Sequence, residues 1–383
     1  MGKHKVAFII SHPIQYYVPL LQGLVKRGNI ELKVFYTWGE DSISKFDPGF
    51  NRIVEWDIPL LEGYSYEFME NIATDPGTHH FKGIDNPSII KKIEDYQPDK
   101  IVVFGWSFKS HLKVLKYFKG RVPIYFRGDS HLLNEQSYLK KIIRKIFLRW
   151  VYSHVDFAIA VGKNNHDYYR WVGLKENQVL FAPHAIDEKR FLDFEGTQAK
   201  ESDLFLESLK IPKDHTVLLY TGKFEHRKNL QTLIRAKLIL KELSCTLILV
   251  GNGPDEEELR DLSKEDKNIH FVGFVNQSKM PMIYRCADVF ILPSISETWG
   301  LGINEAMNSG LAIIASDNVG AAIDLIQNNG FIFRAGDHLD LADHMKKLVQ
   351  DRNLLKMFKK HSTEIIKKWS IEELVRNFEK ALL

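Results

Sequence analysis

Residues 294–310 read SISETWGLGINEAMNSG and place two glutamates, Glu297 and Glu305, on either side of a glycine-rich turn. The preceding residues, ADVFILPS, form an apolar run typical of a buried strand, and LGINEAMNSG favours a short helix. The stretch therefore predicts a strand-to-helix turn. Gly300 and Gly302 let its backbone approach a ligand closely, and the new helix directs its N-terminus there.

Short apolar and β-branched runs alternate with helical stretches along the whole chain, which is typical of parallel sheets covered on both faces. In the first half these runs are KVAFII, ELKVFY, KIVVFG, VPIYFRG, DFAIAVG and QVLFAPH. In the second half they are TVLLYTG, CTLILVG, IHFVGFV, ADVFILPS, LAIIAS and GFIFRAG. The sequence therefore predicts an α/β protein with two doubly wound, Rossmann-like sheets.

The length of 383 residues predicts two domains, because one hydrophobic core stops growing at roughly 250 to 300 residues. A polar, irregular stretch containing EGTQAKESD separates the two sets of strands. We predict an N-terminal domain over residues 1–185, a linker over 186–213 and a C-terminal domain over 214–365. The last segment, residues 366–383, predicts a helix that packs back on the first domain.

The composition excludes several classes of protein. With 44% hydrophobic and 26% charged residues the chain is typical of a globular protein, and a formal charge of +3 does not indicate nucleic acid as a partner. No run of about 18 apolar residues occurs, and the N-terminal VAFII predicts a buried strand rather than a signal peptide. Cys245 and Cys286, which lack metal-ligand spacing, favour a disulfide-free fold in the cytoplasm.

The loops after the second-half strands are the candidate site, because ligands of open parallel sheets bind beyond the carboxyl ends of the strands. After TVLLY, the turn TGKFEHRKNL offers Lys223, Arg227 and Lys228 directly before a helix, which suits a diphosphate; the alternative is a solvated basic turn. After CTLILV, the loop GNGPDEEEL has Gly251 and Gly253 but lacks the third glycine of a dinucleotide fingerprint, which disfavours a dehydrogenase.

The turn quoted first suits a phosphate beside Trp299, Gly300 and Leu301. A carboxylate on that phosphate would be repelled, so Glu297 and Glu305 are expected to accept hydrogen bonds from hydroxyl groups on either side of it. A nucleotide sugar has hydroxyls on both sides of its diphosphate, so one glutamate would hold the sugar and the other the ribose. The alternative for each glutamate is structural, as favourable charge near a helix start or as simple exposure.

Five segments in order, GKFEHRKNL, GNGPDEEEL, NIHFVGFV, YRCADVFILPS and SETWGLGINEAMNSGLAIIAS, resemble the retaining glycosyltransferases of family 4. The resemblance covers about residues 218–336. It implies the GT-B fold, in which two Rossmann-like domains face each other across a cleft. It also implies transfer of a sugar from a nucleotide-sugar donor, with a UDP-sugar favoured, to a glycan or lipid-linked acceptor in cell-surface polysaccharide biosynthesis.

The resemblance further implies roles for single residues. Glu297 would bind hydroxyls of the donor sugar, and Glu305 those of the ribose. Lys223 and Lys228 would bind the diphosphate, and the backbone around Phe274 and Val275 would meet the base. With Trp299, Gly300 and Leu301 from the helix start, Gly222 completes the residues expected to bind the donor.

The first domain departs from the pattern of this family. Many members have a glycine pair after the first strand, whereas this chain has SHPIQYYVPLLQGL, as a subset does, and we take His12 as a site residue. Members also often have a histidine after a later strand that meets the donor sugar. Here YFRGDSHLL has Arg127 at that place, with Asp129 and His131 as alternatives. Asp129 also suits a helix N-cap, and His131 a surface position.

The sequence predicts an enzyme that needs neither a metal nor another cofactor. No Asp-x-Asp motif occurs, and we find no group of His, Asp and Glu with metal-ligand spacing. The charge of the leaving diphosphate would then be neutralised by Lys223, Lys228 and the helix N-terminus. Retention, implied by the resemblance, would have the diphosphate itself take the acceptor proton. The alternatives are a non-catalytic nucleotide-sugar-binding subunit and a GT-B epimerase acting on a UDP-sugar.

The stretch SYLKKIIRKIFLRWVYSHVD has apolar residues at helical spacing, with lysines and arginines around the rest of the wheel. We favour a core helix of the first domain with a solvated basic face. The alternative is a peripheral contact of this face with anionic lipid at the inner face of the cell membrane.

Overall fold

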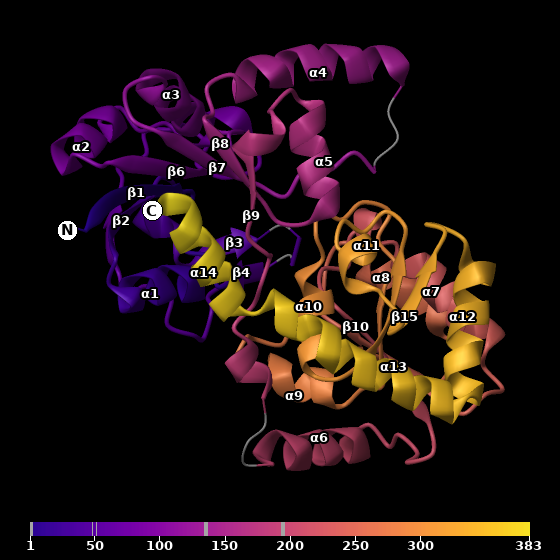
Figure 1. Cartoon of the computed structure of the whole chain (residues 1–383). Helices are drawn as coiled ribbons and strands as arrows, with labels where there is room; N and C mark the ends of the chain where they lie inside the picture. The colour runs from indigo at the N-terminus through magenta and orange to yellow at the C-terminus, as the bar shows by residue number, and fades with distance from the viewer. Residues whose placement is uncertain (1–2, 48, 51, 134–136, 193–195) are drawn as a thin grey trace. The chain divides into compact units, whose positions relative to one another are not determined.

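Figure 1 shows the computed structural model of the chain, which describes residues 3–47, 49–50, 52–133, 137–192 and 196–383. The chain folds into two compact units. Unit 1 comprises Met1–Lys45, Pro59–His184 and Ile371–Leu383, and unit 2 comprises Phe46–Ile58 and Ala185–Ser370. Each unit therefore includes a short segment from a distant part of the sequence.

Unit 1 contains a parallel sheet in the order β5-β2-β1-β6-β7-β8-β9. Its strands are β1 (His4–Ile10), β2 (Ile30–Tyr36), β5 (Ser65–Phe68), β6 (Lys100–Phe104), β7 (Ile124–Arg127), β8 (Phe157–Ala160) and β9 (Val179–Phe181). In the register of the central strand, Val6 lies opposite Leu32 and Lys100. The last five residues of β1 are buried, which accounts for the continuous apolar run VAFII.

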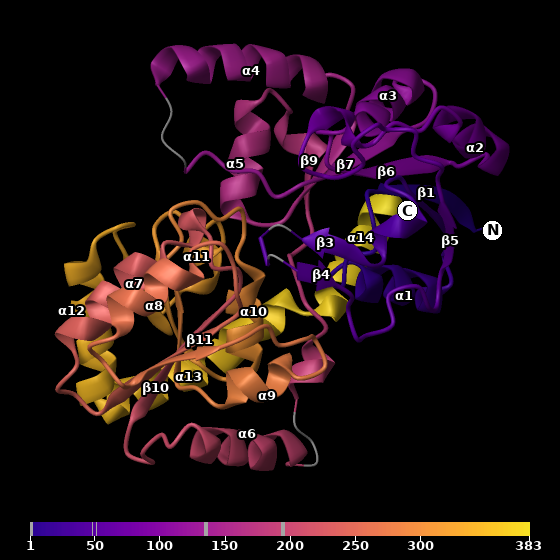
Figure 2. The same ribbon diagram turned by 180° about the vertical axis from the view of Figure 1, so that it is seen from behind.

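Helices cover both faces of this sheet. They are α1 (Val18–Arg27), α2 (Ile89–Tyr96), α3 (Lys109–Phe118), α4 (Tyr138–Tyr152), α5 (Lys163–Trp171) and α14 (Ile371–Leu382). Helices α2, α3, α4 and α5 contribute to one apolar cluster with the sheet, and α1 and α14 lie together on the other face (Figures 1 and 2).

Unit 2 contains a parallel sheet in the order β12-β11-β10-β13-β14-β15. Its strands are β10 (Thr216–Thr221), β11 (Cys245–Val250), β12 (Ile269–Val272), β13 (Val289–Leu292), β14 (Ala312–Ser316) and β15 (Gly330–Phe333). The short strands β3 (Lys45–Asp47) and β4 (Arg52–Val54) form a separate pair. The predicted α/β fold with two doubly wound parallel sheets is confirmed.

The helices of unit 2 are α6 (Thr197–Ser208), α7 (Leu230–Ile239), α8 (Glu256–Ser263), α9 (Met280–Arg285), α10 (Leu301–Asn308), α11 (Ala322–Leu325), α12 (His338–Gln350) and α13 (Arg352–Ile365). In Figures 1 and 2, α7 and α8 lie on one face of the sheet and α9, α10 and α13 on the other. The candidate site is built from the loops that follow the strands at their carboxyl ends, where ligands of such sheets bind.

The segment predicted as a linker, residues 186–213, is instead part of unit 2. Its polar stretch begins helix α6, in which the hydroxyl of Ser202 donates to the carbonyl oxygens of Gln198, at 2.7 Å, and of Met282, at 3.0 Å. The polar composition reflects the exposed side of a surface helix, which the sequence does not distinguish from a loop.

Helix α14 packs within unit 1 against α1. Arg27 of α1 donates to Oε2 of Glu379 at 2.7 Å, and a Cβ at Gly23 would lie 2.4 Å from Val375. The predicted C-terminal segment began at residue 366, but Ile366–Trp369 form a 3₁₀ turn that belongs to unit 2.

No helix in the part of the chain that the structure describes is long and apolar enough to cross a membrane. Cys245 and Cys286 are buried and both are free thiols.

Candidate functional site

The strand order of unit 2 reverses between β10 and β13, which are neighbours in the sheet. Ligands of open parallel sheets bind at such a switch point, because the connections that leave the two strands turn to opposite faces. The loop after β10, residues 222–229, meets the loop after β13, residues 293–300. The amide of Ile295 donates to the carbonyl of Arg227 at 2.9 Å. The fold thus brings the basic turn and the glycine-rich turn together.

Lys228 and Glu297, one from each loop, form an ion pair between Nζ and Oε2. Their side chains are only 14% and 12% exposed, so water screens the pair weakly. The backbone holds Glu297 on both sides, because its amide donates to Asn318 at 3.3 Å and its carbonyl accepts from Gly320 at 2.9 Å. The carboxylate predicted to bind a sugar and the ammonium predicted to bind a diphosphate therefore orient each other.

Lys223 has a different partner, Asp47, whose carboxylate oxygens lie 2.7 and 2.9 Å from Nζ. The ammonium also lies 5.0 Å from the centre of the Phe50 ring. Burial by itself raises the pKa of Asp47, but the hydrogen bonds and charge of Lys223 outweigh it and hold that pKa below its ordinary value. Sequence reasoning missed Asp47, because nothing in KFDPGFNR signals a partner so far along the chain.

The two glycines of GNGPDEEEL fix the shape of the basic turn. A Cβ at Gly251 would lie 1.9 Å from the carbonyl oxygen of Gly222, and one at Gly253 would lie 2.4 Å from the carbonyl oxygen of Phe224. The amide of Phe224 also donates to the carbonyl of Asn252 at 2.9 Å. The loops after β10 and β11 therefore pack backbone against backbone, which only residues without a side chain allow.

We expect Gly251→Ala to destabilise unit 2 by about 3 kcal/mol or more, because Gly251 has φ of 135° and its new methyl would overlap a backbone oxygen. Thermal unfolding measures the loss. Gly336→Ala is the matched control: its φ is 84°, but a Cβ there meets nothing within 4 Å. Equal losses in the two variants would contradict the close packing of the loops.

Helix α10 begins at Leu301, behind Gly300 with φ of 99°. A Cβ at Gly300 would lie 2.8 Å from Cδ2 of Leu292, so both its conformation and its packing require glycine. The first amides of an α-helix have no acceptor one full turn back, and although the amide of Ile303 donates to the carbonyl of Gly300 at 2.9 Å, those of Leu301 and Gly302 suit an anion. The Trp299 side chain is 3% exposed and donates from Nε1 to Asn304 at 2.9 Å, so the indole is held within the fold, and its predicted contact with a phosphate stays a prediction.

Glu305 lies in the second turn of α10 and is 5% exposed. Its Oε2 accepts a hydrogen bond from the hydroxyl of Tyr284 at 2.6 Å, and that hydroxyl lies 2.7 Å from Oγ1 of Thr221, the last residue of β10. The carboxylate is thus not merely exposed on the helix but oriented at the switch point. Tyr284 was missed because its helix, α9, gave no sign in the sequence that it would reach α10.

Phe274 and Val275 follow β12 and are half-buried. The Phe274 ring lies 5.1 Å from the ring of Phe50 and 6.2 Å from that of Trp56, and the guanidinium of Arg52 lies 4.4 Å from its centre. An N-terminal segment of the chain therefore covers the residues predicted to meet the base. That role stays a prediction.

In unit 1, His12 follows β1 at the corresponding switch point, between β1 and β6. Its Nδ1 lies 2.9 Å from the hydroxyl of Ser11, and its ring meets the ring of Trp38 edge to face at 5.3 Å. These contacts orient a half-buried imidazole beyond the carboxyl end of β1. Its contact with a donor stays a prediction.

Arg127, by contrast, is built into the interior of unit 1. It is 2% exposed, donates to the carbonyls of Ala182 at 2.8 Å and Pro183 at 3.2 Å, and lies 5.1 Å from the ring centre of Phe378. Burial lowers the pKa of Arg127 to about 10, so the guanidinium still carries its charge at neutral pH. These contacts favour a structural role for Arg127 over the predicted contact with a sugar.

The two alternatives to Arg127 lie in the loop that follows it. Asp129 is half-buried. His131 is 7% exposed, and its Nδ1 accepts from the amide of Leu133 at 3.1 Å. The predicted surface position of His131 is therefore wrong, because this hydrogen bond folds the imidazole back against its own loop.

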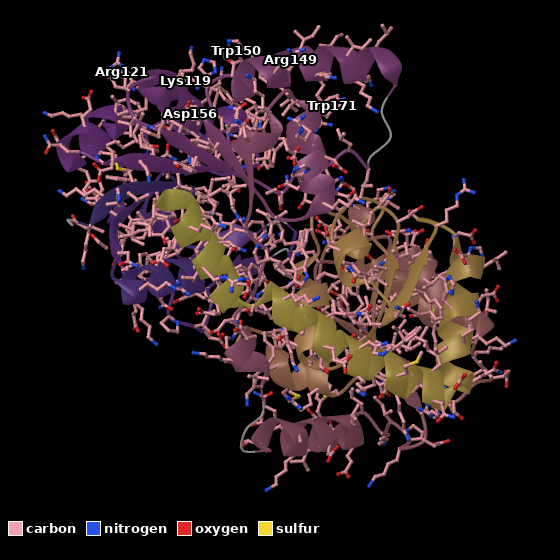
Figure 3. All side chains as sticks on the ribbon, viewed as in Figure 1. Lys119, Arg121, Arg149, Trp150, Asp156 and Trp171 are labelled. Carbon is pink, nitrogen blue, oxygen red and sulfur yellow. The ribbon has the colours of Figure 1, made fainter. Side chains whose placement is uncertain are left out.

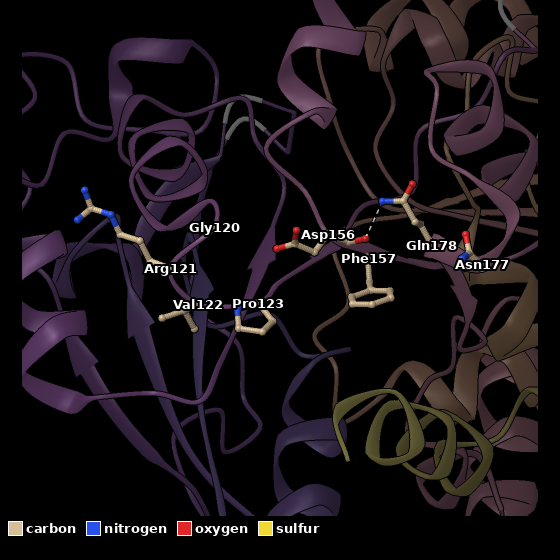
Figure 4. Close-up of a pocket in the computed structure, with 8 residues that line it drawn as sticks. All are labelled: Gly120, Arg121, Val122, Pro123, Asp156, Phe157, Asn177 and Gln178. Atoms are coloured by element: carbon tan, nitrogen blue, oxygen red, sulfur yellow. Dashed lines mark hydrogen bonds between the residues drawn. The ribbon is translucent and has the colours of Figure 1, made fainter.

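A pocket of about 510 Å³ lies at the amino ends of β7, β8 and β9, the edge of the sheet opposite to the switch-point loops (Figure 4). Asp156, which lines it, pairs with Lys119 at 2.5 Å and accepts from the amide of Ile124 at 2.9 Å (Figure 3 labels Asp156 and Lys119). Gln178 donates to the carbonyl of Asp156 at 2.9 Å. The polar groups that line this pocket thus bond to neighbouring parts of the chain, and we assign no ligand to the pocket.

The expectation that no His, Asp and Glu come together at metal-ligand spacing is wrong for one loop. Asp75, His79 and His80 each place a ligand atom within 4.8 Å of the others. They lie in the connection between β5 and α2 of unit 1, where the fold of the loop, rather than a sequence motif, brings them together.

Comparison with known proteins matches residues 201–365 to a family model described as glycosyl transferases group 1. The chain is 26% identical over 392 residues to the alpha-monoglucosyldiacylglycerol synthase of Acholeplasma laidlawii, covering 97% of this chain and 93% of that protein. It is 24% identical over 304 residues to a sulfoquinovosyl transferase of Arabidopsis thaliana, covering 74% of this chain. The chain spans about half or less of the length of several curated relatives that it matches.

Among solved structures, the crystal structure of HepE from Anabaena in complex with UDP superimposes with a TM-score of 0.74. The superposition covers 100% of this chain and 99% of that one, at 16% identity. At this identity the likeness shows the shared fold.

Proposed function

The chain belongs to the group 1 glycosyl transferases of GT-B fold, through the sequence of residues 201–365 and the architecture of both units, and we propose that it transfers a sugar with retention from a UDP-sugar to a glycan or lipid-linked acceptor. The observation that carries the proposal is the arrangement at the switch point of unit 2. There Lys228 and Glu297 pair beside the N-terminus of α10. This puts a cation, a carboxylate and helix amides where one nucleotide sugar needs all three.

The roles follow from the charges. The amides at the start of α10 and the ammonium of Lys228 would bind the diphosphate. Lys223 would add a second cation, either by leaving Asp47 for the diphosphate or by donating to both at once. Lys228 would lie between Glu297 and the phosphates and offset their repulsion, so the carboxylate of Glu297 could accept hydrogen bonds from hydroxyls of the sugar. Glu305 would accept hydroxyls of the ribose. UDP as the nucleotide is supported by the UDP bound to HepE.

Catalysis would need no metal, because the two lysines and the helix N-terminus supply the charge that a divalent ion would otherwise supply to the leaving diphosphate. The acceptor hydroxyl would attack from the face that the nucleotide leaves, and its proton would pass to a departing phosphate oxygen. A cell-surface glycan as product, made at the cytoplasmic face of the membrane, completes the proposal.

We expect one class of nucleotide sugar, the UDP-sugars, to raise the melting temperature of the protein, because a ligand that binds only the native state stabilises it by about 2.7 kcal/mol at 100 times its Kd. Thermal-shift screening across UDP-, GDP- and ADP-sugars measures this. The donor that stabilises is then incubated with candidate acceptors, and the products are read by mass spectrometry. Binding without transfer to any acceptor, and without hydrolysis, would identify a binding subunit. Conversion of the sugar without an acceptor would identify an epimerase.

Transfer should continue after treatment with a chelator, since no step of the proposed chemistry uses a divalent ion. The rate with EDTA is compared with the rates after Mg²⁺ or Mn²⁺ is added. Activity that disappears with EDTA and returns with either ion would contradict metal independence while leaving the transferase assignment in place.

The acceptor side of the proposal rests on α4. The favoured prediction, a core helix with a solvated basic face, is wrong, because among the α4 side chains that the structure describes only Leu148, Val151 and Tyr152 near its C-terminus are buried. Six large apolar residues spaced along the opposite side are 40–72% exposed: Leu139, Ile142, Ile143, Ile146, Phe147 and Trp150. Five cations occupy other positions around the helix: Lys140, Lys141, Arg144, Lys145 and Arg149.

Such a helix suits the surface of an anionic membrane, with its apolar side in the headgroup region and its cations on the lipid phosphates. The exposed side also reaches the carboxyl end of the sheet, because the ring of Phe147 lies 5.5 Å from that of Trp106, which follows β6. A lipid-linked acceptor would therefore meet unit 1 where the exposed side of α4 contacts the loop after β6 of the same unit. The diacylglycerol glycolipid named in one relative supports a lipid acceptor.

We expect the protein to float with vesicles that contain phosphatidylglycerol and to remain unbound with neutral vesicles. Replacing Ile143 and Ile146 by serine should abolish flotation, because both side chains are exposed and no apolar packing is lost. Leu204→Ser, on the surface of α6 and 66% exposed, is the matched control and should float like the unmodified protein. A protein that stays entirely in the soluble fraction would rule out the membrane contact.

A further inference from the structure

The loop between β5 and α2 brings Asp75, His79 and His80 together on the surface of unit 1. Nε2 of His79 lies 3.0 Å from Oδ2 of Asp75, and Nε2 of His80 lies 3.3 Å from the same oxygen. Two imidazole nitrogens thus converge on one carboxylate oxygen. No other group of this kind occurs among the residues described by the structure.

The backbone of the loop is held in place by its own hydrogen bonds. Oδ1 of Asn71 accepts from the amides of Ala73 at 3.2 Å and Asp85 at 2.9 Å, and Nδ2 donates to the carbonyl of Gly83 at 3.0 Å. The amide of Gly77 donates to the same carbonyl at 3.0 Å. The three residues therefore lie on a loop whose backbone is fixed by hydrogen bonds.

The rings are also oriented. A Cβ at Gly77 would lie 2.5 Å from Nδ1 of His79, so the imidazole rests against the glycine backbone. The rings of His79 and His80 meet edge to face with centroids 4.5 Å apart. Nε2 of His80 also lies 3.0 Å from the backbone carbonyl oxygen of Asp75, which adds a second oxygen beside this imidazole.

We propose that Asp75, His79 and His80 bind a zinc ion, through Oδ2 and the two Nε2 atoms. Zinc bonds of about 2.0–2.2 Å in a tetrahedron put neighbouring ligand atoms about 3.3 Å apart, close to the 3.0 and 3.3 Å that separate Oδ2 of Asp75 from the two Nε2 atoms. Two nitrogens and one oxygen favour borderline ions such as Zn²⁺ over Mg²⁺ and Ca²⁺, which take oxygen ligands. Solvent or the carbonyl of Asp75 completes the tetrahedron.

The site lies in unit 1, outside the loops of unit 2 to which sugar transfer is assigned, so it goes beyond the proposed function. Bound zinc would cross-link the loop Asn71–Asp85. Asn86, directly after this loop, donates from Nδ2 to the carbonyl of Thr37 at 2.8 Å, which ties the loop to the turn after β2. Zinc would therefore stiffen the outer strands of the unit 1 sheet at their carboxyl ends.

Calorimetric titration of Zn²⁺ into chelator-treated protein without a polyhistidine tag tests the proposal. We expect saturable binding of one zinc ion per chain. The affinity for zinc should fall by about tenfold to a hundredfold or more in His79→Ala, His80→Ala and Asp75→Ala, because even changes to residues that only support a metal ligand cost that much. His166→Ala is the matched control, because this histidine lies 3.1 Å from a carboxylate of Glu176 but belongs to no such cluster.

Substitution with Co²⁺ gives a second readout, because tetrahedral cobalt has visible absorption bands that the three variants should lose and the control should keep. Asp75 and His79 are exposed and His80 and His166 are half-buried, so in the absence of metal the melting temperatures of the variants should stay close to that of the unmodified protein. Zinc affinity unchanged in His79→Ala and His80→Ala, or no saturable binding at all, would overturn the proposal. Neither result bears on sugar transfer.

Discussion

Lys228→Ala is expected to lower kcat/KM for the cognate donor by about 100- to 1,000-fold, close to the effect of removing one oxyanion donor, roughly 3 kcal/mol. Two losses combine in this variant. The leaving diphosphate loses a cation, and the carboxylate of Glu297, only 12% exposed, is left without its partner beside the phosphates. Lys228→Arg should recover part of the rate, because it restores the charge in a different geometry.

A double-mutant cycle with Glu297→Gln separates these two losses. If Lys228 acts only by orienting Glu297, the double variant is no slower than Glu297→Gln alone. If Lys228 stabilises the diphosphate directly, as proposed, adding Lys228→Ala to Glu297→Gln lowers the rate further. The matched control is Lys359→Ala, which breaks a pair with Asp288 at 2.8 Å at the amino end of β13, away from the switch-point loops. Turnover of Lys228→Ala equal to that of this control would refute the assignment.

Arg127→Met is expected to lower the stability of unit 1 by about 3 kcal/mol, because the buried carbonyls of Ala182 and Pro183 lose their donor and each such loss costs about 1–3 kcal/mol. For a unit of this size the melting temperature should fall by about 10 °C. The rate measured well below the transition should stay close to that of the unmodified protein. Thermal unfolding and kcat/KM are compared on the same preparations.

Arg121→Met is the control, because Arg121 is exposed and its guanidinium only stacks over Tyr117, at 4.0 Å from the ring centre. A surface change of this kind alters stability by about 0.5 kcal/mol at most. A fall in kcat/KM for Arg127→Met with an unchanged melting temperature would show instead that this arginine meets the donor sugar, as the sequence resemblance implied.

The strands and the glycine-rich turn were predictable, because an apolar run buried on both faces and a helix start have strong local patterns. The meeting of the basic turn with Ser294–Gly310 was implied by the switch-point rule. The pairing of Lys228 with Glu297 was not, because each charge had a plausible role alone and the sequence does not indicate their distance. The pairing of Asp47 with Lys223 could not be predicted for the same reason.

Two other misses concern what covers a side chain. The periodicity of α4 shows that it has an apolar side, but the same periodicity serves a core, a partner and a lipid surface. Arg127 is charged and follows a strand, which suggests a ligand contact. Only the folded backbone shows that two carbonyls and the ring of Phe378 enclose it. Asp75 and the two histidines were overlooked because their convergence depends on a loop without a motif.

The close contact between the loops after β10 and β11 limits how relatives of this protein can diverge in donor preference. Positions 251 and 253 have no room for even a methyl group, so neither can acquire a side chain that reads a new base or sugar. We expect divergence in specificity at the residues predicted to meet the base, Phe274 and Val275, whose side chains are half-buried. An experimenter who wishes to alter the donor preference should therefore randomise Phe274 and Val275 and leave Gly251 and Gly253 unchanged.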